Sequence, residues 1–298
     1  MMKFVENRYK FFMISSAVAI ACLIILIVNI ATGKGAFELD VEFSGGTSVL
    51  IDIRQDFSND DILTIVKETT SQTTPQIQPV IGKNQVQIKT KPLTSDEKTA
   101  MIEAIFEKYS LTSDDILDSS DVSPTVSSEM QRTAIIALLV ASIAMLLYVA
   151  VRFHNFAIGI STILALMHDI LLTFLFYSVL RIPLNLSFIA VLLTILGYSI
   201  NATIIVFDRV RENKKLKRME LPELINLSVN QTLKRSLYTT LTTLFSVVAL
   251  YIFGLEEMKQ FALPIIIGLG LGAYSSICIA TPLWYTILTS RGKNTAKA

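Results

Sequence analysis

Six long apolar runs dominate the pattern of hydrophobic and polar positions along the chain. A helix needs about 20 apolar residues to cross a hydrocarbon core of roughly 30 Å, and each run comes close to that length. The pattern therefore predicts an α-helical polytopic membrane protein with six transmembrane helices. The expected spans are 11–31, 133–151, 156–180, 184–207, 236–253 and 261–288.

The first run is expected to stay in the protein as a membrane anchor. It is longer than the usual apolar region of a signal peptide, and it lacks a clear small-x-small cleavage site. Lys3, Arg8 and Lys10 precede it, and basic residues beside a span favour the cytoplasmic side. The sequence therefore predicts a cytoplasmic N-terminus.

Residues 33–130, between the first two spans, form the one sizeable water-soluble segment. Runs of alternating polarity predict strands, and two capping boxes predict the starts of helices. From residue 48 onward the order is β-α-β-β-α-β, which is typical of the ferredoxin-like fold. We therefore expect one external α+β ferredoxin-like domain. Its expected strands are 48–53, 76–81, 85–89 and 115–122, its helices begin at 58–61 and 94–97, and residues 38–43 also alternate in polarity.

A glycine pair turns the chain near the start of this domain. Gly45 and Gly46, followed by Thr47, lack the spacing of a nucleotide-binding loop, so a tight turn is expected. The segment 33–130 contains no His or Cys, and it shows no nucleophile–base pair, metal-ligand cluster or phosphate loop. We therefore expect a domain that binds rather than reacts, in a chain that is no enzyme and uses no metal or cofactor.

Composition and charge agree with a membrane protein and orient it. Hydrophobic residues make up 52% of the chain, and the net charge is +1. That total hides 17 acidic against 8 basic residues in 33–130, and 8 basic against 3 acidic residues in the loop 209–235. A basic loop beside a span marks the cytoplasmic side rather than a nucleic-acid site. Both termini are then expected in the cytoplasm, and the domain is expected outside. Arg181 does not follow this charge bias, because it falls on the outer side. The expected regions are 1–32 (N-terminus and first span), 33–130 (external domain), 131–290 (remaining spans) and 291–298 (cytoplasmic tail).

The basic loop carries an amphipathic pattern. Leu221, Ile225, Val229 and Leu233 recur every four residues, which predicts a helix with one apolar face. Two positions for this helix stay open. It could lie along the cytoplasmic membrane surface, or it could pack against the cytoplasmic end of a partner.

Several polar side chains lie within the spans and are candidates for ion coupling. Asp169 follows His168 in the third span, and a lone carboxylate there costs about 2.5–3.5 kcal/mol unless it is paired or protonated. Each candidate also has a purely structural alternative, such as hydrogen bonding between helices. In the fifth span, Arg235 shares one helical face with Thr239, Thr242 and Ser246. The other candidates are Tyr198, Asn201 and Asp208 in the fourth span.

The stretch Gly197-Tyr198-Ser199-Ile200-Asn201, with Thr203-Ile204-Ile205-Val206-Phe207-Asp208-Arg209 after it, resembles the fourth transmembrane helix of the SecF family of protein-export membrane subunits. The resemblance covers nearly the whole chain in order. It implies late protein export driven by the proton motive force, in an inner or plasma membrane. It implies SecD as a partner in a twelve-helix arrangement, together with the translocon channel and the emerging polypeptide. Similar residues also occur at 43–47, 151–153, 168–169 and 272–276.

The chain departs from the family at Ala202, where the family carries an aspartate thought to couple protons. Alanine cannot carry a proton. Coupling could run through Asp169 or through the partner's carboxylate, the alanine could be an engineered replacement, or the subunit could serve assembly alone. The retained Asn201 and Arg235, the latter matching the arginine that the family places near the coupling aspartate, favour the replacement.

Two further function classes stay open. The chain could be half of a small-solute exporter of the resistance-nodulation-division type, against which its single small external domain argues. It could also be a scaffold that transports nothing.

Overall fold

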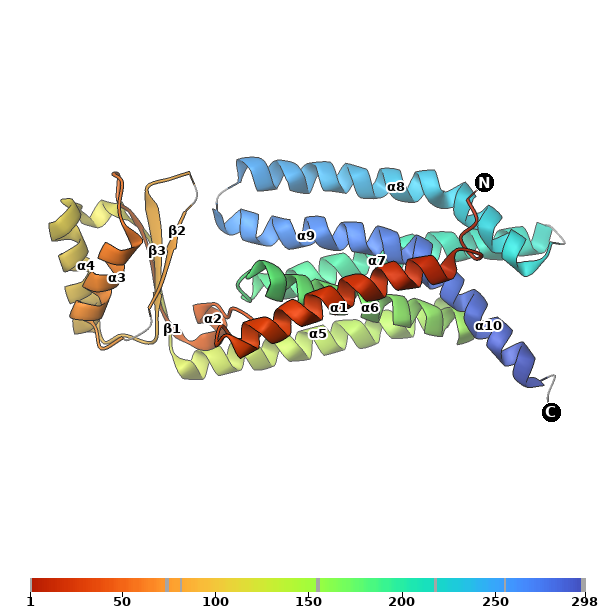
Figure 1. The fold of residues 1–298 in the computed structure, drawn as a ribbon, viewed down its shortest axis with the longest axis horizontal. Helices are drawn as coiled ribbons and strands as arrows, with labels where there is room; N and C mark the ends of the chain where they lie inside the picture. Colours follow the sequence, from red (N-terminus) through yellow and green to blue (C-terminus); the bar gives the residue numbers. More distant parts are fainter. Residues whose placement is uncertain are drawn as a thin grey trace. The chain divides into compact units, whose positions relative to one another are not determined.

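The computed structural model describes residues 2–72, 75–80, 82–153, 156–216, 219–254 and 256–295. The chain divides into two compact units (Figure 1). The helical unit comprises residues 1–38, 137–183 and 187–298, and the α/β unit comprises residues 39–136 and 184–186. Helix α5 is continuous through the boundary between them.

In the described part of the chain, six helical segments are long and apolar enough to cross a membrane, which confirms the expected number. The sixth, Met258–Ser290, changes from α9 through a π-helical turn, η2, into α10. A π-helical turn inside an α-helix is rare and is often found at functional sites. The helices of this unit are α1 (Arg8–Ala31), α5 (Pro124–Phe153), α6 (Phe156–Leu180), α7 (Ser187–Leu216), α8 (Leu221–Phe253), α9 (Glu256–Ser275), η2 (Ser276–Ala280) and α10 (Thr281–Thr295).

Helices α7 and α9 pack closely, because glycines remove the side chains between them. A Cβ atom on Gly268 would lie 2.1 Å from Ile195, and one on Gly272 would lie 3.2 Å from Ser199. Gly268 and Gly272 have the Gly-x-x-x-Gly spacing, which lets the backbones of two helices approach closely.

The amphipathic pattern of 221–233 was interpreted correctly as a helix but placed wrongly. No separate surface helix is formed, because α8 runs without a break from Leu221 to Phe253. Leu224, Ile225 and Val229 are buried in the core of the chain itself, where Phe4 and Val5 join them. The apolar face is therefore covered by the same chain, rather than by the membrane surface or by a partner.

Polar contacts hold the N-terminal segment on α8. The backbone N–H groups of Phe4 and Val5 donate to Oδ1 of Asn226, at 2.8 and 3.1 Å. The amide nitrogen of Asn226 donates to Glu6 at 2.8 Å, which lowers the pKa of that carboxyl. Asn230 accepts from the N–H of Met2 and donates to its carbonyl. These contacts fix the segment that precedes α1.

The α/β unit has the predicted ferredoxin-like order. Its four antiparallel strands are arranged β2-β3-β1-β4, and α3 and α4 cover one face of the sheet (Figure 1). Val49, Ile51, Val86 and Ile88 from the sheet meet Ile62 and Met101 from the helices in a dry core. The elements are α2 (Val41–Ser44), β1 (Gly46–Asp52), α3 (Asn59–Thr69), β2 (Gln76–Pro79), β3 (Gln85–Thr90), α4 (Ser95–Tyr109), η1 (Ser113–Asp115) and β4 (Ile116–Val122).

One local prediction in this unit is wrong, the capping box at 58–61. The alternating segment 38–43, for which no element was predicted, leads into the short helix α2, which the Asp40 carboxylate caps by accepting from the N–H of Val41 at 2.7 Å. Ser58 lies at the N-cap of α3, but its side chain forms no capping hydrogen bond. The capping box of Thr94 and Glu97, by contrast, is confirmed at the start of α4.

Glu97 makes part of this unit's stability depend on pH. Its carboxylate accepts from the N–H of Thr94 and from Ser71, which lowers its pKa from 4.5 to about 2. A lowered pKa in the folded chain gives stability that is full above the unfolded value and is lost as the pH falls through about 2. We expect Glu97→Gln to speed hydrogen exchange at the start of α4 at neutral pH, relative to the unaltered chain. The ratio of the exchange rate in Glu97→Gln to that in the unaltered chain should approach one as the pH falls from about 4.5 to about 2. A ratio that stays constant with pH would contradict this role.

Candidate functional site

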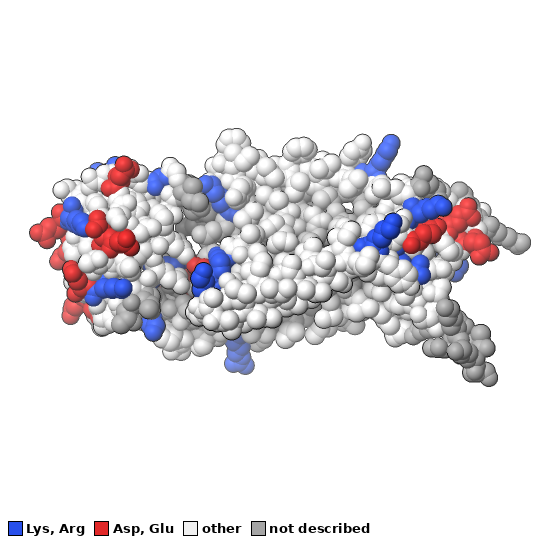
Figure 2. Space-filling view, viewed as in Figure 1, with Lys and Arg blue, Asp and Glu red and all other residues white. Residues whose placement is uncertain are grey.

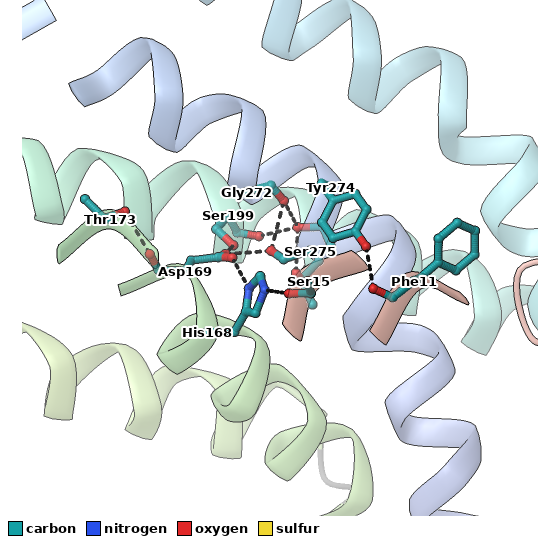
Figure 3. Close-up of polar contacts among 11 residues, drawn as sticks. Phe11, Ser15, His168, Asp169, Thr173, Ser199, Gly272, Tyr274 and Ser275 are labelled. Atoms are coloured by element: carbon teal, nitrogen blue, oxygen red, sulfur yellow. Dashed lines mark hydrogen bonds and ion pairs between the residues drawn. The ribbon is translucent and has the colours of Figure 1, made fainter. Parts of the chain in front are cut away.

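Asp169 is the centre of a buried polar cluster in the helical unit (Figure 3). Its side chain is fully buried on α6. Oδ2 accepts from the hydroxyl of Ser199 on α7 at 2.5 Å and from the hydroxyl of Ser275 on α9 at 2.6 Å. Oδ1 lies 2.9 Å from Nδ1 of His168. One carboxyl therefore joins three helices through short hydrogen bonds.

The cluster extends to α1 through His168. Nε2 of the imidazole is hydrogen-bonded to the hydroxyl of Ser15, which is buried on α1. A second polar contact lies nearby, where the Tyr274 hydroxyl donates to the carbonyl of Phe11 at 2.7 Å (Figure 3). Asp169, His168, Ser15, Ser199 and Ser275 are called the Asp169 cluster below.

The local sequence explains why hydroxyls converge on Asp169. Gly272 brings α9 against Ser199, and the π-helical turn begins directly after Ser275. Ser276, the first residue of that turn, donates to the carbonyl of Ser199 at 3.0 Å and accepts from Thr203 at 2.9 Å. Small polar residues at a close helix contact can satisfy a carboxyl where water is absent.

The predicted candidates of α7, which are Tyr198, Asn201 and Asp208, do not join this cluster. The residue of α7 that does contact Asp169 is Ser199, which follows Tyr198. Tyr198 is half-buried, and its hydroxyl accepts from Thr243 of α8 at 3.2 Å. Asn201 is exposed and Ala202 is half-buried. Asn201 therefore faces away from the interior of this chain, whereas Asp169 lies within it.

Asp208 lies in the last third of α7, before its end at Leu216, and is held by two arginines. Arg152 of α5 forms an ion pair with it, and Arg211 lies 3.5 Å away. Arg209 pairs instead with Glu212 at 2.6 Å. The carboxylate of Asp208 therefore lies between two guanidinium groups.

An open polar pocket of about 370 Å³ lies between α7 and α8 beside this ion pair. Arg235 is exposed at its rim. In Figure 2, charged side chains gather at the end of the helical unit that carries the α7–α8 connection, and the helical face beyond it is largely uncharged. The pocket is lined by Ile205, Asp208, Arg209, Glu212, Gln231, Thr232 and Arg235.

The hydroxyl stripe that follows Arg235 is exposed on α8. Thr239 donates to the carbonyl of Arg235, Thr242 to that of Thr239 and Ser246 to that of Thr242. These hydroxyls therefore bond back to carbonyl groups of their own helix. The exposed stripe lies on the same two-helix surface as Asn201 and Arg235.

The glycine turn belongs to the sheet of the α/β unit. Gly45 has φ +71° and ends α2, and Gly46 has φ +145° and begins β1. The hydroxyl of Thr47 donates to Asp121 of β4 at 2.7 Å. The pKa of Asp121 is lowered, since Lys98 and Thr47 both hydrogen-bond to its carboxylate and outweigh its partial burial. This arrangement is structural, and within the described residues no three His, Cys, Asp or Glu side chains gather into a metal site.

Sequence reasoning singled out Asp169 and His168 but missed Ser15. Ser15 and His168 are 153 positions apart, and a serine in an apolar run gives no signal of its partner. Ser275 and Ser276 lie in the stretch 272–276 that resembles the family, and the structure shows that both take part in hydrogen bonds between helices.

The comparisons with known proteins match most of this chain to one family. The family described as Protein export membrane protein SecD/SecF, C-terminal, matches residues 101–290. Protein translocase subunit SecF of Petrotoga mobilis is 34% identical over 99% of this chain and 98% of its own length. The SecF subunit of Calditerrivibrio nitroreducens is 37% identical over 96% of this chain and 94% of its own. The crystal structure of SecDF, a translocon-associated membrane protein from Thermus thermophilus, matches with a TM-score of 0.83 and 32% identity over 97% of this chain. This chain spans 39% of that longer SecDF chain.

Proposed function

Because the chain belongs to the SecD/SecF family of protein-export membrane proteins, we propose that it acts as a SecF-type accessory subunit of the Sec translocase. The observation that carries this proposal is the similarity to SecF subunits over nearly their whole length. In this function the external domain, together with that of SecD, holds the emerging polypeptide while ion flow resets the pair. Proton motive force then supplies the energy.

SecD is the partner that the relatives support, since several carry both parts as one SecDF chain. The exposed α7–α8 surface with Asn201, Arg235 and the hydroxyl stripe fits a place where this partner's helices pack. Only a small part of the membrane-spanning portion of α8 is buried within the chain. Exposed polar groups in a span are costly against lipid, so a protein partner stabilises them. The proposed topology places both termini in the cytoplasm and the α/β unit outside.

Asp169 is the group of this chain that we propose to carry the coupling proton. Alanine at 202 cannot titrate, and Asp208 is held by Arg152 and Arg211. Asp169 is fully buried among neutral hydroxyls and an imidazole. A buried carboxyl with those neighbours is neutral with one proton and negative without it, and that change can bias how the surrounding helices pack.

The substitution Ala202→Asp separates this proposal from the idea that the chain is disabled at that position. The test follows completion of a secretory precursor in vesicles that contain the chain, SecD and the translocon, with and without a proton ionophore. We expect the unaltered chain to show ionophore-sensitive export, and Ala202→Asp to change that sensitivity less than twofold, because Asp169 already supplies the titrating group.

Ionophore sensitivity that appears only after Ala202→Asp would show that position 202 is the proton switch, and it would overturn coupling through Asp169. Export that proceeds at the same rate with and without the ionophore, in both the unaltered chain and Ala202→Asp, would favour a scaffold that transports nothing. Ala202→Asn is the matched control, since its amide has nearly the size and shape of the aspartate carboxyl and does not titrate near neutral pH.

A further inference from the structure

Among the described residues that contact the carboxyl of Asp169, one side chain is partly exposed and can pass a proton to it. Asp169 is 0% exposed, whereas the side chain of His168 is 19% exposed. The other groups in contact with Asp169 are the hydroxyls of Ser199 and Ser275, which are themselves buried. Access to Asp169 therefore passes through the imidazole.

The two ring nitrogens of His168 face opposite partners. Nδ1 lies 2.9 Å from Asp169, and Nε2 is hydrogen-bonded to Ser15 of α1. This geometry resembles the serine–histidine–aspartate arrangement of hydrolases. The exposed fraction of His168 lies inside a membrane span, and we assign the arrangement to proton transfer rather than to acyl chemistry.

We propose that His168 is the proton relay of Asp169, and that Ser15 covers the outer nitrogen so that α1 controls access. The proposal rests on the proposed proton coupling and names how that site is regulated. When water replaces Ser15, Nε2 takes up a proton and the imidazole becomes positively charged. The proton on Nδ1 then passes to Oδ1 of Asp169. His168 is neutral again, the carboxyl is neutral, and the cluster has gained one proton.

The groups around the pair are suited to hold one proton. Three of the elements packed against α6 present an uncharged group to the pair: Ser15 from α1, Ser199 from α7 and Ser275 from α9. In the described residues, the one ion pair of Asp169 is with His168, and no Lys or Arg approaches it. The nearby Tyr274 hydroxyl is bonded to the carbonyl of Phe11. Once the Asp169 carboxylate and the neutral imidazole of His168 have gained one proton, the pair carries no net charge. A pair without net charge is the favoured state away from water.

The consequence is mechanical as well as chemical. Helix α1 continues from Ser15 to Ala31 and is followed by the α/β unit in sequence. A movement of α1 away from His168 opens the site to a proton, and its return closes the site. The same helix therefore links proton access to the segment that leads to the external domain.

The test measures exchange of the Asp169 proton in the full-length chain in lipid nanodiscs. The infrared carbonyl band of the protonated carboxyl is assigned by its loss in Asp169→Asn, and its shift is followed after transfer to deuterated water. His168→Gln keeps a polar side chain but cannot relay a proton. We expect it to slow the exchange about a hundredfold, the lower end of what a positioned proton-transfer group contributes. Ser15→Ala should instead speed the exchange by about tenfold or more, since it uncovers Nε2.

Ser16→Ala is the matched control for Ser15→Ala, because Ser16 is an exposed hydroxyl on the same helix. It should leave the exchange rate unchanged. An unchanged rate in His168→Gln would overturn the relay. A rate in Ser15→Ala that is equal to or slower than that of the unaltered chain would overturn the control by α1. Because this readout needs no export, it fails or succeeds independently of the ionophore experiment.

Discussion

Replacing Gly46 by alanine is expected to destabilise the α/β unit by about 3 kcal/mol or more. A Cβ atom at this position would lie 2.1 Å from the carbonyl oxygen of Thr90, which is a backbone atom of the adjacent strand β3. Gly46 also has φ +145°, a conformation that L side chains rarely adopt. The sheet would have to open between β1 and β3, where Thr47 and Thr90 are paired.

The measurement is hydrogen exchange in peptides that cover β1 and β3 of the full-length chain. Gly82→Ala provides a matched control in the same unit. Gly82 has φ +77°, but a Cβ there would meet nothing within 4 Å. The control should therefore cost only the left-handed strain, about 1–2 kcal/mol. Equal effects of the two substitutions would contradict the close contact with Thr90.

The periodicity of the sequence predicted the elements better than it predicted their neighbours. The third span was expected at 156–180, and α6 has these bounds. Hydrophobic periodicity shows which face of a helix is buried, but not what buries it. Ile225 and Val229 were therefore assigned to a buried face correctly, while their partners Phe4 and Val5 could not be foreseen.

The site shows the same division between local signal and distant contact. A carboxyl within an apolar run is visible in a sequence because its insertion is costly, and so Asp169 was singled out. Two serines on other helices contact it directly, and a third, Ser15, reaches it through His168. Serine is common in membrane helices for structural reasons. The convergence of Ser15, Ser199 and Ser275 depends on how those helices pack. Position 202 was singled out because the aspartate of the family is missing there. The buried carboxyl that this chain does carry is Asp169 on α6.

Replacing Asp169 by asparagine is expected to remove the ionophore-sensitive part of export. The amide has nearly the same shape as the carboxyl. Its oxygen can still accept from Ser199 and Ser275, and its nitrogen can donate to His168, so the helices should remain packed. It cannot bind and release a proton. One charge moved across 100 mV supplies about 2.3 kcal/mol, so the loss of coupling can slow export by at most about fiftyfold.

The measurement is precursor export in vesicles with SecD and the translocon, in the presence and absence of a proton ionophore. Asp208→Asn is the control, since it removes a partly exposed carboxyl of the same chain that Arg152 and Arg211 hold. We expect Asp208→Asn to keep its response to the ionophore and Asp169→Asn to export at the ionophore-treated rate under both conditions. If Asp169→Asn responds to the ionophore as strongly as the unaltered chain does, the coupling proton is carried by the partner, and the Asp169 cluster only holds the helices together. The two substitutions differ in burial but not in chemistry, so a difference between them would place the coupling proton in the helix interior.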